Sequence, residues 1–308
     1  MQQTEYFPYV FFDGKITKVE AANVPIMTNA LQYGTGVFGG IRGYYNDKEK
    51  KLSIFRIEDH VKRFLSSLKI LGVELKYSQE ELVKIILDLA KKNNPKTDAY
   101  FRIFAYAGSI NLSPNLERDH EFDFALYMLS LDEYLPINKG LSAMVSSWRR
   151  VSDNAIPPRG KISGSYVNSA LARQEATKNG CDEAIFLTQD GHVSEGSAEN
   201  IFIVKNGVLI TPPETDDILE GITRRSILEL AKDLKVEVNI RSIDRSELYA
   251  ADEAFFSGTA VQIAWIARID NRVIGDGKRG PITEKLQELF FKIVRGEEQK
   301  YQSWCTKI

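Results

Sequence analysis

The strongest constraint on the fold is that short apolar runs of period two alternate along the chain with longer runs of period 3.6. The first kind, as in residues 9–12 and 53–57, is typical of strands, and the second is typical of amphipathic helices. One helical stripe ends before Gly72, a residue suited to a helix C-terminus. Its apolar positions are Val61, Phe64, Leu65, Leu68 and Leu71. The alternation predicts an α/β, or mixed α+β, fold.

Capping and turn signals locate the other elements. Ser78 and Glu81 have the spacing of a capping box, which predicts the start of a second helix. Asn206-Gly207 is typical of a tight hairpin turn. Further strands are expected over residues 100–107, 122–131, 143–148, 183–188, 200–204 and 236–240, and further helices after Gly164, over 223–234, after Asp244 and after Pro281.

Residues 132–140 form the expected connection between two domains. The segment contains Pro136 and Gly140, and both residue types interrupt regular structure. A length of 308 residues also favours two domains over one. We therefore predict a smaller N-terminal α/β domain over residues 1–131, a linker over 132–140 and a larger C-terminal domain over 141–308.

Charge and cysteine content exclude several classes of protein. The net charge is -2, so no global basic field is present to collect nucleic acid or anionic lipid. The first ten residues lack a basic segment followed by an apolar stretch, and no apolar run could cross a bilayer, so a cytoplasmic protein is expected. Cys181 and Cys305 lie far apart, and they support neither a disulfide framework nor a zinc site. No metal is predicted.

Lys161 lies in a turn rich in proline and glycine, P-P-R-G-K-I-S-G-S-Y-V-N over residues 157–168. A lysine amine attacks an aldehyde only when it is neutral, which requires burial or a neighbouring cation, such as Arg159, to lower its pKa. A single lysine is more often a solvated surface residue, so this assignment depends on the rest of the chain.

Two carboxylates, Glu195 and Glu199, lie among small residues before an apolar strand, in G-H-V-S-E-G-S-A-E-N over residues 191–200. A buried carboxylate here could keep a pyridinium nitrogen protonated and so make the ring an electron sink. A turn in which both carboxylates face water explains the same pattern equally well.

Two further stretches could bind a phosphate. L-E-G-I-T-R-R over residues 219–225 places a glycine before a helix, whose free amides and dipole favour an anion, and S-G-T-A follows over 257–260. The hydroxyls of Thr223 and Thr259 could add hydrogen bonds. Each stretch alone is better explained as an ordinary helix start or turn.

Residues 34–39, G-T-G-V-F-G, formally match the glycine pattern of dinucleotide-binding oxidoreductases. That pattern requires an apolar strand before the first glycine and a helix after the last. Residues 28–33 are mixed and residues 40–43 are interrupted by glycine, so this class is disfavoured. A non-enzymatic interaction protein is disfavoured as well, because it needs no combination of lysine, carboxylate and phosphate-binding stretches.

Together these stretches resemble the fold-type IV pyridoxal-phosphate transaminases, and among them most closely the branched-chain amino-acid aminotransferases. The order of lysine turn, S-E-G-x-x-E-N, G-I-T-R and S-G-T-A matches that family, and A-L-Q-Y-G-T-G-V-F, G-I-R, F-R and Y-F-R continue the likeness in the first half. The resemblance implies pyridoxal 5'-phosphate held between two domains and an active site completed across a homodimer. It also implies amino transfer between branched-chain L-amino acids and 2-oxoglutarate.

The same resemblance assigns roles to individual residues. Lys161 would form a Schiff base with the cofactor and move the substrate proton, Glu195 would pair with the ring nitrogen, and Tyr166 would hydrogen-bond the phenolic oxygen. The phosphate would be bound by Arg56, Ile222, Thr223 and Thr259. The substrate would be bound by Tyr33 of the partner subunit, Phe38, Gly40, Tyr100 and Arg102, with the backbone amides of Thr259 and Ala260 at its carboxylate. Core packing explains Tyr33 and Phe38 equally well.

Several departures from the family pattern concern the substrate pocket. Gly39 stands where these enzymes commonly have glutamate, N-L-S-P-N over residues 111–115 replaces a G-V-N-P-like loop, and Leu131 stands where some relatives have tryptophan. A transaminase of the same fold acting on D-amino acids or (R)-amines, and aminodeoxychorismate lyase, stay open as alternatives. The pair Tyr100 and Arg102 favours the branched-chain type, because an apolar pocket with one cationic edge suits both branched aliphatic amino acids and glutamate.

Overall fold

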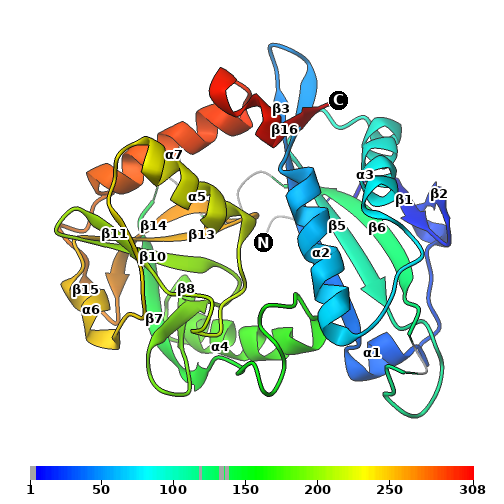
Figure 1. Cartoon of the computed structure of the whole chain (residues 1–308), viewed down its shortest axis with the longest axis horizontal. Coiled ribbons are helices and arrows are strands. Elements are labelled where there is room, and N and C mark those ends of the chain that lie inside the picture. Colours follow the sequence, from blue (N-terminus) through cyan, green and yellow to red (C-terminus); the bar gives the residue numbers. More distant parts are fainter. Residues whose placement is uncertain (1–4, 118–119, 132–134, 136–138) are drawn as a thin grey trace. The chain divides into compact units, whose positions relative to one another are not determined.

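The computed structural model describes residues 5–117, 120–131, 135 and 139–308, and the chain divides into two compact units (Figure 1). The first comprises Met1–Asp132, Gly160–Gly164 and Lys292–Ile308, and the second comprises Glu133–Arg159 and Ser165–Phe291. Most of the expected linker, residues 132–140, lies outside the described residues, so the domain boundary stays a prediction.

Two segments predicted to belong to the C-terminal domain group with the first unit instead. The reason is backbone pairing. Ile162 forms an isolated bridge with Val37, and the last strand of the chain, Cys305–Lys307, pairs with the strand Lys51–Phe55. Both pairings join residues more than one hundred positions apart, which no local pattern could indicate.

The first unit contains a seven-stranded sheet in the order β16-β4-β3-β5-β6-β1-β2, in which every pairing is antiparallel. Its strands are β1 (Tyr9–Phe12), β2 (Lys15–Lys18), β3 (Gly36–Asn46), β4 (Lys51–Phe55), β5 (Ala99–Tyr106), β6 (Asp123–Ser130) and β16 (Cys305–Lys307). Its helices are α1 (Asn29–Tyr33), α2 (Ile57–Leu71) and α3 (Gln79–Asn93), with short 3-10 turns at Val19–Ala21 and Gln299–Trp304.

Helices α2 and α3 pack on one face of this sheet, where their apolar stripes and the strands form one core (Figure 1). The predicted helix ends are confirmed. Gly72 has a left-handed φ of 69° after α2, and at the start of α3 Ser78 Oγ accepts from Glu81 N–H while Glu81 accepts from Ser78 N–H. These local signals are strong because they satisfy backbone groups that a helix end leaves unpaired.

Strand β3 corrects the sequence interpretation of residues 40–43. We expected glycine to interrupt this segment, but it belongs to one 11-residue strand. The glycines make room for neighbouring strands: a Cβ on Gly39 would lie 2.7 Å from Ile103 Cγ1, and one on Gly43 would lie 2.8 Å from Leu52 Cδ2. A dinucleotide fold is still excluded here, because a helix precedes the glycines and a strand follows them.

The second unit contains a nine-stranded sheet in the order β12-β11-β10-β13-β14-β7-β8-β9, with β15 paired to β14. Its strands are β7 (Leu141–Arg149), β8 (Glu183–Leu187), β9 (Val193–Gly196), β10 (Asn200–Lys205), β11 (Val208–Thr211), β12 (Val238–Ile240), β13 (Glu253–Gly258), β14 (Gln262–Ile269) and β15 (Arg272–Val273). The helices are α4 (Tyr166–Lys178), α5 (Ile222–Asp233), α6 (Arg245–Ala250) and α7 (Pro281–Val294), and a 3-10 turn lies at Ser163–Ser165.

Local signals hold in this unit as well. Asn206 and Gly207 have φ values of 52° and 80° and join β10 to β11, as a two-residue hairpin turn requires. Helix α6 begins with a capping box between Asp244 and Glu247, and α7 begins at Pro281. The predicted mixed α/β fold is therefore confirmed.

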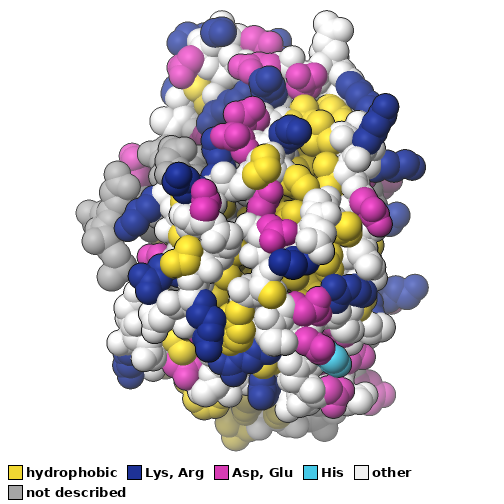
Figure 2. Space-filling model, turned by 90° about the vertical axis from the view of Figure 1, so that its left-hand side faces the viewer, with side chains coloured by type: hydrophobic (Ala, Val, Ile, Leu, Met, Phe, Trp, Pro, Cys, Tyr) yellow, Lys and Arg dark blue, Asp and Glu magenta, His cyan; other side chains and the backbone are white. Residues whose placement is uncertain are grey.

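The face shown in Figure 2 carries basic and acidic side chains interspersed with one another, in keeping with the small net charge of -2. Within the described part of the chain, no helix is long and apolar enough to cross a membrane. The cytoplasmic location stays a prediction. Cys181 and Cys305 are free and partly buried.

Candidate active site

The backbone around Lys161 is fixed to β3 and α2 within the first unit. Phe38 N–H donates to Lys161 C=O at 3.0 Å, and Lys161 N–H donates to Ser67 Oγ of α2 at 3.1 Å. Next to it, Gly164 N–H donates to Gly34 C=O at 3.1 Å. Gly34 has a φ of 70°, and a Cβ there would lie 2.9 Å from Gly164 Cα, so only glycine fits.

The side chain of Lys161 lies beside Phe38 on the sheet face opposite α2. Lys161 Nζ is 5.0 Å from the centre of the Phe38 ring, and Arg102 Cζ is 4.6 Å from the same centre. Arg102 also donates to Tyr100 Oη at 3.4 Å. A Cβ on Gly40 would lie 1.8 Å from Tyr100 Oη, so this hydroxyl lies against the bare backbone of β3. Five predicted site residues thus form one group.

Two other sequence predictions have different outcomes. Arg159, suggested as the cation beside Lys161, has an exposed side chain, whereas Arg102 is the arginine that shares a ring with the lysine. Tyr33 ends α1 and is 38% exposed, so it is not a core residue of this chain, whereas Phe38 is 8% exposed.

Arg56 occupies the residue before α2 in the left-handed region, with a φ of 45°. Its guanidinium lies against the indole of Trp304, 3.7 Å from the ring centre, and its Nη1 is 3.1 Å from Asp59 Oδ2. The Arg56 N–H also donates to Trp304 C=O at 2.6 Å. Sequence reasoning identified Arg56 but missed Trp304, which lies near the other end of the chain and belongs to no motif.

The second unit holds Glu195 as a buried carboxylate that is 5% exposed and well supplied with partners. Arg150 Nη2 lies 2.8 Å from Glu195 Oε1, and Glu195 Oε2 accepts hydrogen bonds from Asn200 Nδ2 at 3.0 Å and Leu219 N–H at 3.1 Å. Glu199 is 4% exposed and accepts from Ala198 N–H. The alternative in which both carboxylates face water is therefore wrong.

Arg150 and Asn200 are contributors that sequence reasoning did not single out. Arg150 Nε also donates to Asp217 C=O at 3.3 Å, and Asn200 Nδ2 also donates to Leu219 C=O at 2.8 Å. Asn200 belongs to the S-E-G-x-x-E-N pattern, but the sequence analysis gave it no role. Its position next to Glu199 was the signal that could have identified it. The sequence around Arg150 gave no signal of its role, because its partner Glu195 is distant in the sequence.

The start of α5 is packed against the same network. Gly221 precedes the helix without a side-chain cap, and a Cβ there would lie 2.1 Å from Asn200 Oδ1. Ile222 and Thr223, the first helical residues, are 4% and 3% exposed. Asn200 therefore contacts both the Glu195 carboxylate and Gly221, the residue before α5, a helix whose first amides favour an anion.

The S-G-T-A stretch spans the end of β13 and the start of the turn that follows it. A Cβ on Gly258 would lie 3.7 Å from Glu199 Cγ, so this turn lies beside the Glu199 segment, and Thr259 and Ala260 are partly buried in it. Among the described residues, the buried Ser257 Oγ has no hydrogen-bond partner. Tyr166 begins α4 and is partly buried.

These residues fit a phosphorylated pyridine cofactor. An uncapped helix start and an unsatisfied buried hydroxyl suit a phosphate, a buried carboxylate suits a ring nitrogen, and a lysine beside an aromatic ring suits an aldehyde. Each unit, described by itself, carries part of this set.

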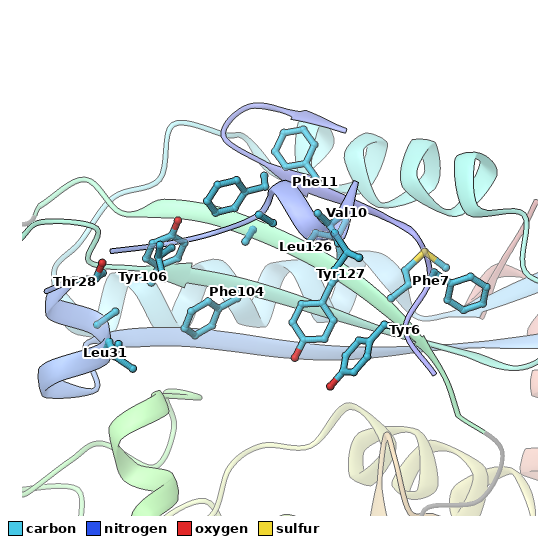
Figure 3. A pocket seen from close by; sticks show the side chains of 17 residues that line it. Tyr6, Phe7, Val10, Phe11, Thr28, Leu31, Phe104, Tyr106, Leu126 and Tyr127 are labelled. Carbon is cyan, nitrogen blue, oxygen red and sulfur yellow. The ribbon is translucent and has the colours of Figure 1, made fainter. Parts of the chain in front are cut away.

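The first unit also has an apolar hollow of about 420 Å³ against strands β1, β5 and β6 (Figure 3). Phe104 and Tyr106 of β5 and Leu31 of α1 point into it. Tyr127 of β6 lies beside Tyr6, with the ring centres 5.8 Å apart. None of the predicted site residues lines this hollow, so it is distinct from the group around Phe38.

A lysine turn, a buried carboxylate and an uncapped helix start are the features that the sequence resemblance to the class IV aminotransferases led us to expect. The model of the family "Amino-transferase class IV" matches residues 36–269, and the chain belongs to that family. Enzymes of this family use pyridoxal phosphate, the cofactor expected from the sequence.

Relatives match over nearly the whole chain. A probable branched-chain-amino-acid aminotransferase from Aquifex aeolicus is 49% identical over 97% of this chain and 96% of its own length. The branched-chain-amino-acid aminotransferase of Escherichia coli K12 is 38% identical over 99% of both chains. A crystal structure of the branched-chain aminotransferase from Thermoproteus uzoniensis with norvaline superposes with a TM-score of 0.93, at 44% identity and 99% coverage of both chains.

Proposed function

We propose that the protein transfers amino groups between branched-chain L-amino acids and 2-oxoglutarate, with pyridoxal phosphate attached to Lys161. The observation that carries this proposal is the group around Phe38, in which a lysine amine and one arginine share an apolar ring. An apolar surface suits an aliphatic side chain, and the arginine suits the second carboxylate of glutamate.

A second solved relative supports both halves of this substrate pair. It is a branched-chain amino acid aminotransferase whose structures hold N-(5'-phosphopyridoxyl)-L-glutamate in one case and 4-methylvaleric acid in another. The first of these structures matches this chain with a TM-score of 0.93 and 38% identity, over 97% of this chain and 98% of its own. One compound has an acidic side chain and the other a branched aliphatic one, as the Arg102 and Phe38 side chains together would require.

In the proposed mechanism, pyridoxal phosphate supplies an electron-poor ring that accepts the electron pair left when the substrate loses its α-proton. Lys161 would hold the cofactor through its aldehyde, and the neutral lysine amine would move the substrate proton at the α-carbon. The buried Glu195 carboxylate would hold a proton at the ring nitrogen, and the Tyr166 hydroxyl would donate to the phenolic oxygen.

Binding and orientation are assigned to other residues. The phosphate would be held by Arg56, by the first amides of α5 at Ile222 and Thr223, and by Thr259, and this would fix the ring relative to the lysine. The backbone amides of Thr259 and Ala260 bind the substrate carboxylate. The side-chain pocket is formed by Phe38, Gly40, Tyr100 and Arg102, with Tyr33 from a second copy.

We further propose that the protein works as a homodimer in which a second copy covers the apolar hollow of the first unit. Leu31, which lines the hollow, is 65% exposed, and Ile26, which lies in the chain between the lining residues Val24 and Thr28, is 79% exposed. Exposed apolar surface of this kind is typical of interaction sites. Sedimentation should give a dimer for the natural sequence and a monomer for Leu31→Asp, and a natural chain that sediments as a monomer would refute this part of the proposal.

The main test is the absorbance spectrum of the protein with pyridoxal phosphate, before and after adding an amino donor. We expect a visible band that L-leucine removes and 2-oxoglutarate restores. Lys161→Ala should lose this band, whereas Lys178→Ala, which changes an exposed lysine of α4, should keep it.

Other outcomes of this test identify the competing enzymes. Removal of the band only by D-alanine or (R)-1-phenylethylamine would assign the protein to the other transaminases of this fold. Release of pyruvate from aminodeoxychorismate without any keto acid would assign it to the lyases. A protein without a visible band would lose the cofactor assignment altogether.

A further inference from the structure

The end of the chain returns to the proposed phosphate-binding side of the first unit. Strand β16 pairs with β4 in the register Cys305 with Phe55, so Trp304, which precedes β16, is brought to Arg56, which follows β4. Further back, Arg295 anchors the segment through two hydrogen bonds to Asp98, at 2.6 Å and 2.8 Å. The segment is therefore held at both ends, with Trp304 between the two attachments.

Trp304 contacts Arg56 through both its backbone and its ring. Its carbonyl accepts the Arg56 N–H at 2.6 Å, and the guanidinium carbon lies 3.7 Å from the centre of its indole. The indole is itself held by the rings of Tyr301, 4.6 Å away, and Phe55, 6.1 Å away. The Arg56 side chain is only 7% exposed as a result of this enclosure and its pairing with Asp59.

Stacking of this kind fixes the orientation of a guanidinium and leaves the N–H donors of the guanidinium available. The five N–H groups of arginine lie in the guanidinium plane, whereas an indole engages its face. A stacked arginine loses less side-chain freedom when it binds a phosphate, because the ring has already restricted its rotamers. The attraction is strongest for tryptophan among the aromatic residues.

We propose that Trp304 is a positioning residue for the cofactor phosphate, acting through Arg56. This inference rests on the proposed function, in which Arg56 binds the cofactor phosphate. It predicts that Trp304 contributes to cofactor affinity, although it lies outside residues 36–269, which the family model matches.

The test compares binding of pyridoxal phosphate with binding of pyridoxal, which has the same aldehyde and no phosphate. Both are titrated into the full-length, cofactor-free protein and followed by the visible band. Trp304→Leu should weaken pyridoxal-phosphate binding about tenfold and leave pyridoxal binding unchanged. Trp304→Phe should lose about threefold, because phenylalanine keeps a smaller aromatic face. Trp148→Leu, which changes a half-exposed tryptophan of β7, is the matched control and should alter neither.

The ratio of the two affinities separates positioning from a general structural role. Equal weakening of both ligands by Trp304→Leu, or no weakening of either, would overturn the proposal. If the leucine variant does not fold, an unchanged ratio in Trp304→Phe overturns it instead.

An Arg56→Leu variant makes failure of the proposal distinguishable from failure of the proposed function. If this variant keeps the natural ratio, the phosphate role of Arg56 is wrong and the inference falls with it. If Arg56→Leu lowers the ratio and Trp304→Leu does not, only the role of Trp304 is wrong.

Discussion

Arg150 and Glu195 form an ion pair 2.8 Å long in which the two side chains are 7% and 6% exposed. A buried pair of this kind contributes little net stability compared with an apolar pair, but removing one partner leaves a buried charge without compensation. Arg150 therefore allows a charged Glu195 to exist inside the second unit, at the position where the proposed mechanism needs it.

The ion pair predicts that substitutions of Arg150 and Glu195 have non-additive effects on the free energy of unfolding. Arg150→Met should lower the free energy of unfolding by about 3 kcal/mol, because Glu195 is left charged and buried. Adding Glu195→Gln to it should restore part of that loss, since the uncompensated charge is then gone. Urea unfolding of the two single variants and the double variant measures this. A double variant whose loss equals the sum of the single losses would contradict the coupling.

Gly221 is predicted to affect cofactor binding because it leaves room for the Asn200 side chain. The backbone freedom of glycine is not needed at this position. Its φ of -72° suits alanine, but a Cβ would lie 2.1 Å from Asn200 Oδ1. Gly221→Ala should displace Asn200, loosen Glu195 and weaken pyridoxal-phosphate binding about tenfold, the effect of losing about 1.4 kcal/mol. In an Asn200→Ala background the obstacle is gone, so Gly221→Ala should then cost little. A full loss in that background, measured by the same titration, would disprove the clash.

Elements with strong local signals could be predicted from the sequence. The ends of α2 and α3 and the turn at Asn206 and Gly207 follow from capping and turn chemistry, which depends on neighbouring residues. The candidate site residues could be proposed from the sequence as well, because each belongs to a short pattern, and their roles stay predictions.

Features that depend on distant residues could not be predicted. β3 was misinterpreted because its glycines are explained only by the side chains of Ile103 and Leu52 on the neighbouring strands. Trp304 and Arg150 were missed for the same reason, since their partners are far away in the sequence. Local patterns locate the groups that could do chemistry, but long-range packing decides which side chains support them.

Gly39 and Gly40 predict opposite effects from adjacent substitutions, because successive residues of a strand face opposite sides. A Cβ on Gly40 meets Tyr100 Oη at 1.8 Å on the proposed substrate side, whereas one on Gly39 meets Ile103 Cγ1 at 2.7 Å in the core. Gly40→Ala should raise KM for L-leucine about tenfold by displacing Tyr100, and Gly39→Ala should lower stability by about 1–3 kcal/mol with KM unchanged. Steady-state kinetics and thermal unfolding of both variants provide the comparison. Equal KM values in the two variants would contradict the assignment of Tyr100 to the substrate pocket.

Asp270 predicts a pH dependence of stability that is independent of the active site. Burial acts to raise the pKa of its carboxyl, but hydrogen bonds from Tyr249 Oη at 2.6 Å, Arg245 Nη2 at 2.8 Å and Val145 N–H at 2.8 Å outweigh it and hold the pKa below the ordinary 3.8. A carboxyl whose pKa is lowered by folding stabilises the protein above its unfolded pKa, and this contribution disappears as the pH falls through the lower folded value.

Asp270→Asn isolates this contribution, because asparagine has the same shape and also tolerates the φ of 47° at this position. The variant should be about 1–2 kcal/mol less stable than the natural protein at neutral pH, since Arg245 and Tyr249 lose a charged acceptor. The difference should shrink once the pH falls below 3.8, the ordinary value for this carboxyl. Urea unfolding across this range, with the exposed Asp276→Asn as control, tests the prediction. A difference that persists unchanged in acid would mean that the ionised carboxylate is not what stabilises this corner of the second unit.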